Sequence, residues 1–185
     1  MARELRVGGV TPFSATDYPG QLAAVVFSGG EACMDPALEN AMRDVKARGF
    51  KVGLHTACIY PQRLRQVLPL VDWVGFDIKA AFTEYRAITG IANSGDPARA
   101  CLDAIVASGV AHECRTTIHP ALLPDAALLE LAAMLAEKGV SNYVLQQFSK
   151  AGCTDTDLLN ATLHGYPAAA TLSQLAAMFP RFTFR

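Results

Sequence analysis

Short runs of β-branched and apolar residues alternate along the chain with longer segments whose apolar residues recur at helical spacing. This alternation constrains the fold most, because strands that alternate with helices form parallel βαβ units. About five parallel strands are too few for a closed eight-stranded barrel. We therefore expect an α/β fold, a partial and open βα barrel of mainly parallel strands. The strands are predicted over Leu22–Phe27, Lys51–Thr56, Asp72–Lys79, Glu113–Ile118 and Tyr143–Phe148, with a terminal strand over Phe182–Phe184.

Helices are predicted between these strands from their start and stop signals. The Asp35-Pro36 pair predicts an N-cap followed by proline at the first helical position, and Gly49 ends that helix. Asp96-Pro97 predicts a second helix start by the same rule. The other helical segments are expected over Pro61–Leu68, Phe82–Thr89, Asp125–Lys138 and Leu172–Met178. Because no linker-like segment divides the 185 residues, we expect residues 1–185 to form a single domain.

Composition excludes several classes of function. The chain is 51% hydrophobic and carries a formal net charge of −1, which suits a globular enzyme and gives no electrostatic footprint for nucleic acid. No apolar run approaches the roughly 20 residues that a membrane span requires. The N-terminal segment contains no signal-type apolar core, so we expect a cytoplasmic location.

The stretch Val25–Glu31 predicts a binding site. A buried strand ends abruptly here in Ser28, Gly29 and Gly30, and an acid follows. Glycines allow positive φ angles and a close approach of the backbone to a ligand, and we expect Glu31 to lie at the rim. In α/β folds, ligands bind at the carboxyl ends of the strands.

Polar residues also follow the other predicted strands. Each has a plain structural interpretation: a core histidine at His55, a surface pair of Asp77 with Lys79, and an ion pair at Arg115. Together at one edge of a sheet, they favour a site for a zwitterionic, hydroxyl-bearing small molecule. The strand ends are Ser28–Glu31, His55-Thr56, Asp77-Ile78-Lys79, Arg115–Thr117 and Gln146-Gln147.

These residues carry a family resemblance. The ordered set of Thr16–Gly20, Ser28–Glu31, Asp77–Lys79 and Arg115–Thr117 resembles the radical S-adenosylmethionine activating enzymes. Within that family, the chain is most similar to the activating protein of anaerobic ribonucleoside-triphosphate reductase. The resemblance covers most of the chain, from about Leu5 to Phe148.

The resemblance implies S-adenosylmethionine as cofactor and a glycyl-radical enzyme as partner. It implies that Gly29, Gly30 and Glu31 bind the methionyl amino group. It places Asp77 and Lys79 near the methionyl carboxylate. By the same resemblance, Arg115 contacts the ribose or the carboxylate, and His55 stands where relatives often carry aspartate.

The chain departs from the family in its cysteines. Family members hold a four-iron four-sulfur cluster with a Cys-x3-Cys-x2-Cys loop after the first strand. The five cysteines here (Cys33, Cys58, Cys101, Cys114 and Cys153) are scattered, and no such motif occurs. The first predicted strand runs directly into the Gly-Gly-Glu turn, which indicates a barrel shortened by about one βα unit. The resemblance therefore implies a cluster whose ligands this sequence lacks.

Three functions remain open from the sequence. The first is an activase-type relative that has lost its cluster chemistry. The second is a non-catalytic S-adenosylmethionine-binding or scaffold protein. The third is an aldolase-like enzyme, because a lysine at a strand end, Lys79, can form a Schiff base with a carbonyl substrate.

Overall fold

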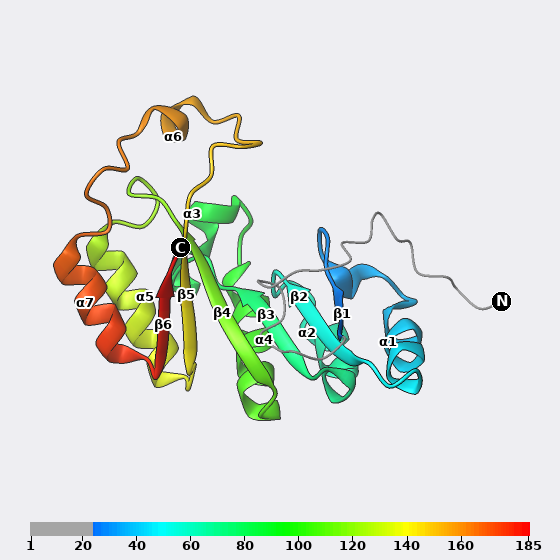
Figure 1. The fold of residues 1–185 in the computed structure, drawn as a ribbon. Coiled ribbons are helices and arrows are strands. Elements are labelled where there is room, and N and C mark those ends of the chain that lie inside the picture. The colour runs from blue at the N-terminus through cyan, green and yellow to red at the C-terminus, as the bar shows by residue number, and fades with distance from the viewer. Residues whose placement is uncertain (1–23) are drawn as a thin grey trace. The chain divides into compact units, whose positions relative to one another are not determined.

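The structure is a computed structural model, and it describes residues 24–185 (Figure 1). The predicted lead-in over Leu5–Gly20, with the Thr16–Gly20 segment of the resemblance, lies outside the described residues. Six strands within residues 24–185 are parallel and follow one another in chain order, with helices between them. This arrangement confirms the predicted α/β class, a partial and open βα barrel.

The described chain divides into two compact units. Unit 1 contains residues 24–76 and 97–112, and unit 2 contains residues 77–96 and 113–185. The expectation of a single domain stays a prediction. Within residues 24–185, no helix is both long enough and apolar enough to cross a lipid bilayer.

Unit 1 is built on three parallel strands. β1 (Ala24–Phe27) pairs with β2 (Lys51–Thr56), which pairs with β3 (Trp73–Asp77). The prediction for β2 is confirmed residue for residue, whereas β3 is shorter than its predicted range at both ends. The core of β2 and β3 is fully buried, as expected for a parallel sheet covered on both faces. Its fully buried members are Val52, Leu54, Val74 and Phe76.

The helices of unit 1 begin and end at recognisable signals. They are η1 (Ala32–Met34), α1 (Leu38–Ala47), α2 (Pro61–Val67), η2 (Leu68–Leu70) and, from residue 97 on, α4 (Gly95–Ser108). The predicted start of the first helix at Asp35-Pro36 is wrong. The Asp35 carboxylate accepts the Ala37 N–H at 2.8 Å and closes a turn before the helix begins. The predicted stop is confirmed, because Gly49 follows α1 at φ 84°.

An aspartate joins three elements at the start of β2. The Asp72 carboxylate accepts the Val52 N–H at 2.9 Å and lies 3.0 Å from the ammonium groups of both Lys46 and Lys51. Burial alone raises the pKa of Asp72, but these donors outweigh burial and lower the pKa below its ordinary value. Asp72 therefore links α1, β2 and the residue before β3 as an ionised side chain.

Unit 2 contains the other three strands and two long helices. β4 (Ala111–Ile118), which belongs to unit 2 from residue 113 on, pairs with β5 (Asn142–Gln147), which pairs with β6 (Arg181–Phe184). Helices α5 (Asp125–Glu137) and α7 (Ala169–Met178) lie side by side next to these strands (Figure 1). The shorter elements are η3 (Phe82–Glu84), α3 (Tyr85–Thr89) and α6 (Thr156–Asn160), of which only α6 was not predicted.

One glycine of unit 2 allows a close backbone contact. A Cβ atom placed on Gly95 would lie 1.9 Å from the carbonyl oxygen of Phe82, a distance that no side chain tolerates. The start of α4 is therefore set against η3 by a residue that has to be glycine.

Candidate functional site

The turn after β1 has the backbone geometry that its sequence predicts. Gly29 and Gly30 have φ angles of 99° and 57°, which L-residues with side chains rarely adopt. Both glycines are exposed, and nothing lies within 4 Å of a Cβ atom placed on either one. The turn Ser28–Glu31, called the 28–31 turn below, therefore presents bare backbone at the carboxyl end of a parallel strand.

Glu31 ends this turn as an internal brace. Its carboxylate accepts the N–H groups of Cys33 at 3.1 Å and Ala57 at 2.7 Å, and the Thr56 hydroxyl lies 3.0 Å from both of its oxygens. Glu31 is only 8% exposed. The expectation that Glu31 lies at the rim is wrong, because the carboxylate turns inward and ties the end of β1 to the end of β2. Its role toward a methionyl amino group stays a prediction.

Ser28 begins the turn and is held by the neighbouring residue of β2. The Ser28 hydroxyl lies 3.2 Å from Nδ1 of His55. His55 and Thr56 are consecutive strand residues, so their side chains point to opposite faces of the sheet. The 28–31 turn is thus fixed at both ends, by His55 at Ser28 and by Thr56 at Glu31.

His55 is oriented by its packing. Its ring meets the Trp73 ring edge to face, with the ring centroids 5.5 Å apart. In the register of β2 and β3, His55 lies opposite Gly75 and Trp73 lies opposite Gly53. The two rings are therefore diagonal neighbours, and each has a glycine opposite it. The histidine is half-buried rather than enclosed in the core.

The cysteines do not provide a ligand set for an iron–sulfur cluster. Burial, and next the Glu31 carboxylate, raise the pKa of the Cys33 thiol to about 12. Burial likewise raises the pKa of Cys114, with Asp77 and Glu113 adding to the effect. An iron–sulfur cluster needs several cysteines close together, whereas Cys33 lies in η1 and Cys114 lies in β4. Among residues 24–185, no three His, Cys, Asp or Glu side chains gather as a metal-binding group. The described residues therefore do not fit the cluster.

In unit 2, Asp77 and Lys79 project from a well-anchored backbone. Lys79 Nζ lies 3.9 Å from the Asp77 carboxylate, and their side chains are 41% and 43% exposed. The Ile78 N–H donates to the Arg115 carbonyl at 2.9 Å, and the Lys79 N–H donates to the Tyr85 hydroxyl at 2.9 Å. The main chain is thus held while the two charged groups remain accessible to a ligand.

Two further hydrogen bonds in series hold the backbone of the Asp77–Lys79 segment. The Thr116 hydroxyl donates to the Ile78 carbonyl at 2.7 Å, and the Tyr143 hydroxyl donates to Thr116 at 3.0 Å. Burial raises the pKa of Tyr143 far above its ordinary value, so the phenol keeps its proton and acts as a donor.

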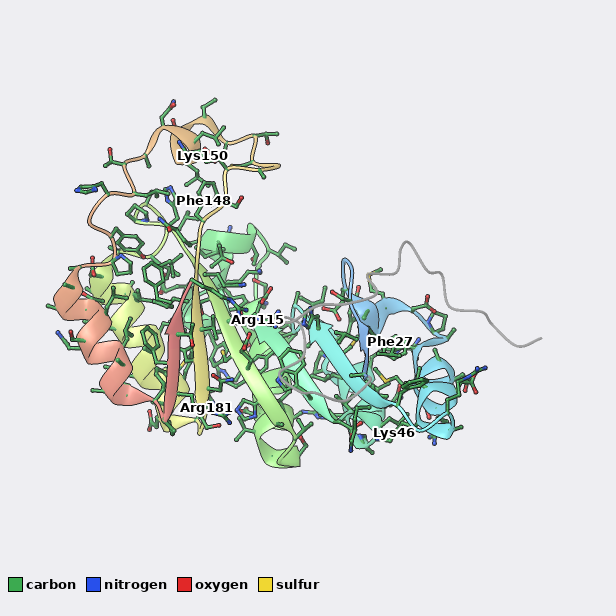
Figure 2. The ribbon with its side chains drawn as sticks, in the orientation of Figure 1. Phe27, Lys46, Arg115, Phe148, Lys150 and Arg181 are labelled. Atoms are coloured by element: carbon green, nitrogen blue, oxygen red, sulfur yellow. The ribbon has the colours of Figure 1, made fainter. Side chains whose placement is uncertain are left out.

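Arg115 forms the ion pair that its plain interpretation predicts. Its Nε donates to a Glu113 carboxylate oxygen at 2.7 Å, and Arg185 donates to the same oxygen at 3.1 Å. Arg115 lies on β4 (Figure 2) and is 8% exposed. Its predicted contact with a ribose or carboxylate stays a prediction.

The structure thus groups the predicted site residues within each unit. Unit 1 brings together Gly29, Gly30, Glu31 and His55, and unit 2 joins Asp77 with Lys79 and links the Arg115 backbone to the segment between them. Sequence reasoning missed Glu113, although it lies two residues before Arg115 and strand alternation therefore places both on the same face. It also missed Tyr85, for which the sequence carried no signal.

Comparison with known proteins identifies a shared fold. The structure matches a domain of pyruvate-formate lyase-activating enzyme from Bacteroides vulgatus with a TM-score of 0.63 and 13% identity, over 88% of this chain and 99% of that one. It also matches TYW1 with a lysine-pyruvate adduct bound, with a TM-score of 0.57 and 18% identity. The chain shares its fold with both.

The TYW1 match covers 84% of this chain and 49% of TYW1. No protein-family profile and no curated protein sequence matches the chain. At the level of the fold, the two structures agree with the resemblance to radical S-adenosylmethionine activating enzymes.

Proposed function

We propose that the chain is a relative of the radical S-adenosylmethionine activating enzymes that binds S-adenosylmethionine without cleaving it reductively. The observation that carries this proposal is the 28–31 turn. Its two exposed glycines hold positive φ angles at a strand end, and the inward-facing Glu31 braces them. A turn that is rigid, bare and open to solvent suits recognition of a ligand by backbone atoms.

Unit 2 separately carries residues that suit the charged groups of the ligand. Asp77 and Lys79 offer an accessible carboxylate and ammonium for the two charges of an amino-acid moiety. The proposal assigns them to the methionyl end, and assigns Arg115 and His55 supporting positions. The partner is a glycyl-radical enzyme such as anaerobic ribonucleotide reductase, and the location is the cytoplasm. Because the described thiols do not fit a cluster, the proposal contains no radical step.

Calorimetry with S-adenosylmethionine tests the proposal. We expect weak binding, in the millimolar range, because the iron that anchors the methionyl end in the family has no ligands here. The decisive variants are Gly29→Ala and its matched control, Gly49→Ala. Both glycines lie in unit 1, both have positive φ angles (99° and 84°), and both have open space around them.

Strain from the added methyl group is therefore similar in the two variants, whereas only Gly29 lies in the proposed site. We expect Gly29→Ala to weaken binding at least tenfold, about 1.4 kcal/mol, and Gly49→Ala to leave it unchanged. No heat at millimolar ligand, or equal losses in both variants, would reject the proposal and leave a scaffold role.

A second candidate function rests on Lys79. This lysine is 41% exposed beside Asp77, and one structural neighbour carries a lysine-pyruvate adduct. Its amine can condense with a ketone to form an imine and release water. The candidate ranks second, because Asp77 pairs with the ammonium form, which is not a nucleophile.

Borohydride trapping with pyruvate distinguishes the two candidates. The Schiff-base function predicts a stable mass increase at Lys79 that Lys79→Arg abolishes, with Lys46→Arg as the control. A chain that gains no mass excludes it.

A further inference from the structure

We propose that Ser28 and His55 form a nucleophile–base pair that accepts an acyl group from an activated ester. The Ser28 hydroxyl lies 3.2 Å from Nδ1 of His55, within the range in which a general base takes up the proton of a nucleophile. This pair uses only residues of unit 1. It shares the 28–31 turn and His55 with the proposed S-adenosylmethionine site but does not use Asp77, Lys79 or Arg115, so loss of the serine label and loss of S-adenosylmethionine binding are separate outcomes.

The backbone places the two groups opposite each other. β1 and β2 run parallel with Phe27 paired to Leu54, so the next residues along both strands are Ser28 and His55. The edge-to-face contact with the buried Trp73 ring restricts rotation of the imidazole. In the tautomer that carries its proton on Nε2, the ring accepts the hydroxyl proton at Nδ1.

The space around Ser28 suits an incoming ester. Ser28 is exposed, and neither Gly29 nor Gly30 has an atom within 4 Å of its Cβ position. The two residues that follow Ser28 therefore carry no side chain, and the space on their Cβ side is open. Their peptide N–H groups are the next main-chain donors after it. The proposal assigns these N–H groups to the oxyanion of the tetrahedral intermediate, a role that backbone donors fill in acyl transfer.

The reaction balances with an ester and water alone. Ser28 Oγ bonds to the acyl carbon, its proton passes to His55 Nδ1, and the alcohol leaves with that proton as the ester C–O bond breaks. Water then attacks the acyl-serine, gives its proton to His55 and releases the carboxylic acid, and Oγ recovers the proton. Neither step changes an oxidation state.

Acylation by p-nitrophenyl acetate and labelling by a fluorophosphonate test the pair on the full chain. We expect a burst of p-nitrophenolate and a label that peptide mapping places on Ser28. Ser28→Ala should abolish the label. His55→Gln should slow labelling by about 10²-fold or more, the usual contribution of a general base.

Ser108→Ala is the matched control, because Ser108 is an exposed serine of unit 1 whose hydroxyl donates only to the Ile105 carbonyl. Its labelling should equal that of the unchanged chain. A label on another residue, or an unchanged rate in Ser28→Ala, would overturn the proposal. Peptide mapping of the unchanged chain decides the question even if His55→Gln fails to fold.

Discussion

Glu31 and Asp77 are both acids at the carboxyl end of a parallel strand, yet the structure uses them in opposite ways. Glu31 is 8% exposed and accepts hydrogen bonds from two backbone N–H groups and a hydroxyl. The Asp77 side chain is 43% exposed, and its ion pair with Lys79 is 3.9 Å long. An acid at a strand end is therefore a ligand group only if its own chain leaves it unsatisfied. If the difference holds, removing Glu31 should lower the free energy of unfolding far more than removing Asp77.

The largest effect is expected for Glu31→Ala. The change leaves the N–H groups of Cys33 and Ala57 and the Thr56 hydroxyl without their acceptor in a buried place. We expect the free energy of unfolding to fall by about 3 kcal/mol or more, since each bond to a charged group contributes about 1.5–3 kcal/mol.

Urea unfolding measures this change, and Glu39→Ala is the control. Glu39 pairs with Arg43 on the exposed face of α1, so its removal should cost no more than about 0.5 kcal/mol. Equal losses in the two variants would contradict the bracing role.

A smaller loss is expected for Thr56→Val, which keeps the side-chain shape and removes the hydroxyl. That hydroxyl donates to Glu31 and accepts the Cys58 N–H at 3.0 Å. We expect a loss of about 1–2 kcal/mol, typical of a buried hydrogen bond. Thr117→Val, at an exposed position near the end of β4, is the comparison in unit 2 and should be nearly neutral. A neutral Thr56→Val would show that the backbone donors alone hold Glu31.

Features that depend on neighbouring residues could be predicted from the sequence, whereas contacts between residues far apart in the chain could not. The range of β2 was predicted correctly because Gly49 marks the end of the preceding helix and the strand core at Val52 and Leu54 is apolar. The 28–31 turn was predicted because two consecutive glycines after an apolar strand indicate positive φ angles. The inward position of Glu31 was not, because its partner Thr56 lies 25 residues away and only the strand pairing joins them.

A local sequence signal also gave a wrong helix start where the same residues suit both a helix cap and a turn. Asp35-Pro36 suits a helix start, but the same aspartate closes a turn onto Ala37, and the helix begins at Leu38. Helix α6 has its own cap, since Asp155 accepts the N–H groups of Asp157 and Leu158. At 5 residues it is too short to show a periodic apolar face.

Asp72 is intermediate between the buried Glu31 and the exposed Asp77. Its contribution to stability can be tested by its dependence on pH. Its pKa is lowered in the folded chain, so its stabilisation is present above the ordinary value of 3.8 and is lost as the pH falls through the lower folded value. Asp72→Asn should lower the free energy of unfolding by about 1 kcal/mol at neutral pH.

The difference between Asp72→Asn and the unchanged chain should shrink as the pH falls below 3.8. Lys51→Met removes one of the donors and should reproduce part of this acid dependence. A difference that stays constant from neutral pH down to pH 2 would contradict the assignment to Asp72.

The smallest effect on stability is expected at Asp77. The pair with Lys79 is long and solvent-exposed, so Asp77→Asn should change the free energy of unfolding by less than about 0.5 kcal/mol. The same variant should weaken S-adenosylmethionine binding in calorimetry, because the carboxylate is accessible. A large loss of stability would place Asp77 with Glu31 as a structural acid and remove the contrast.

The high pKa of Cys33 also has a kinetic consequence. The thiol lies two residues after Glu31, is 2% exposed and has a pKa of about 12, so the folded chain offers almost no thiolate to an alkylating reagent. Alkylation must therefore proceed through molecules in which η1 has opened and the Cys33 N–H has left the Glu31 carboxylate. The rate of iodoacetamide modification at Cys33, followed by peptide mapping in native buffer, thus reports how often the 28–31 turn opens, on a timescale that equilibrium unfolding does not resolve.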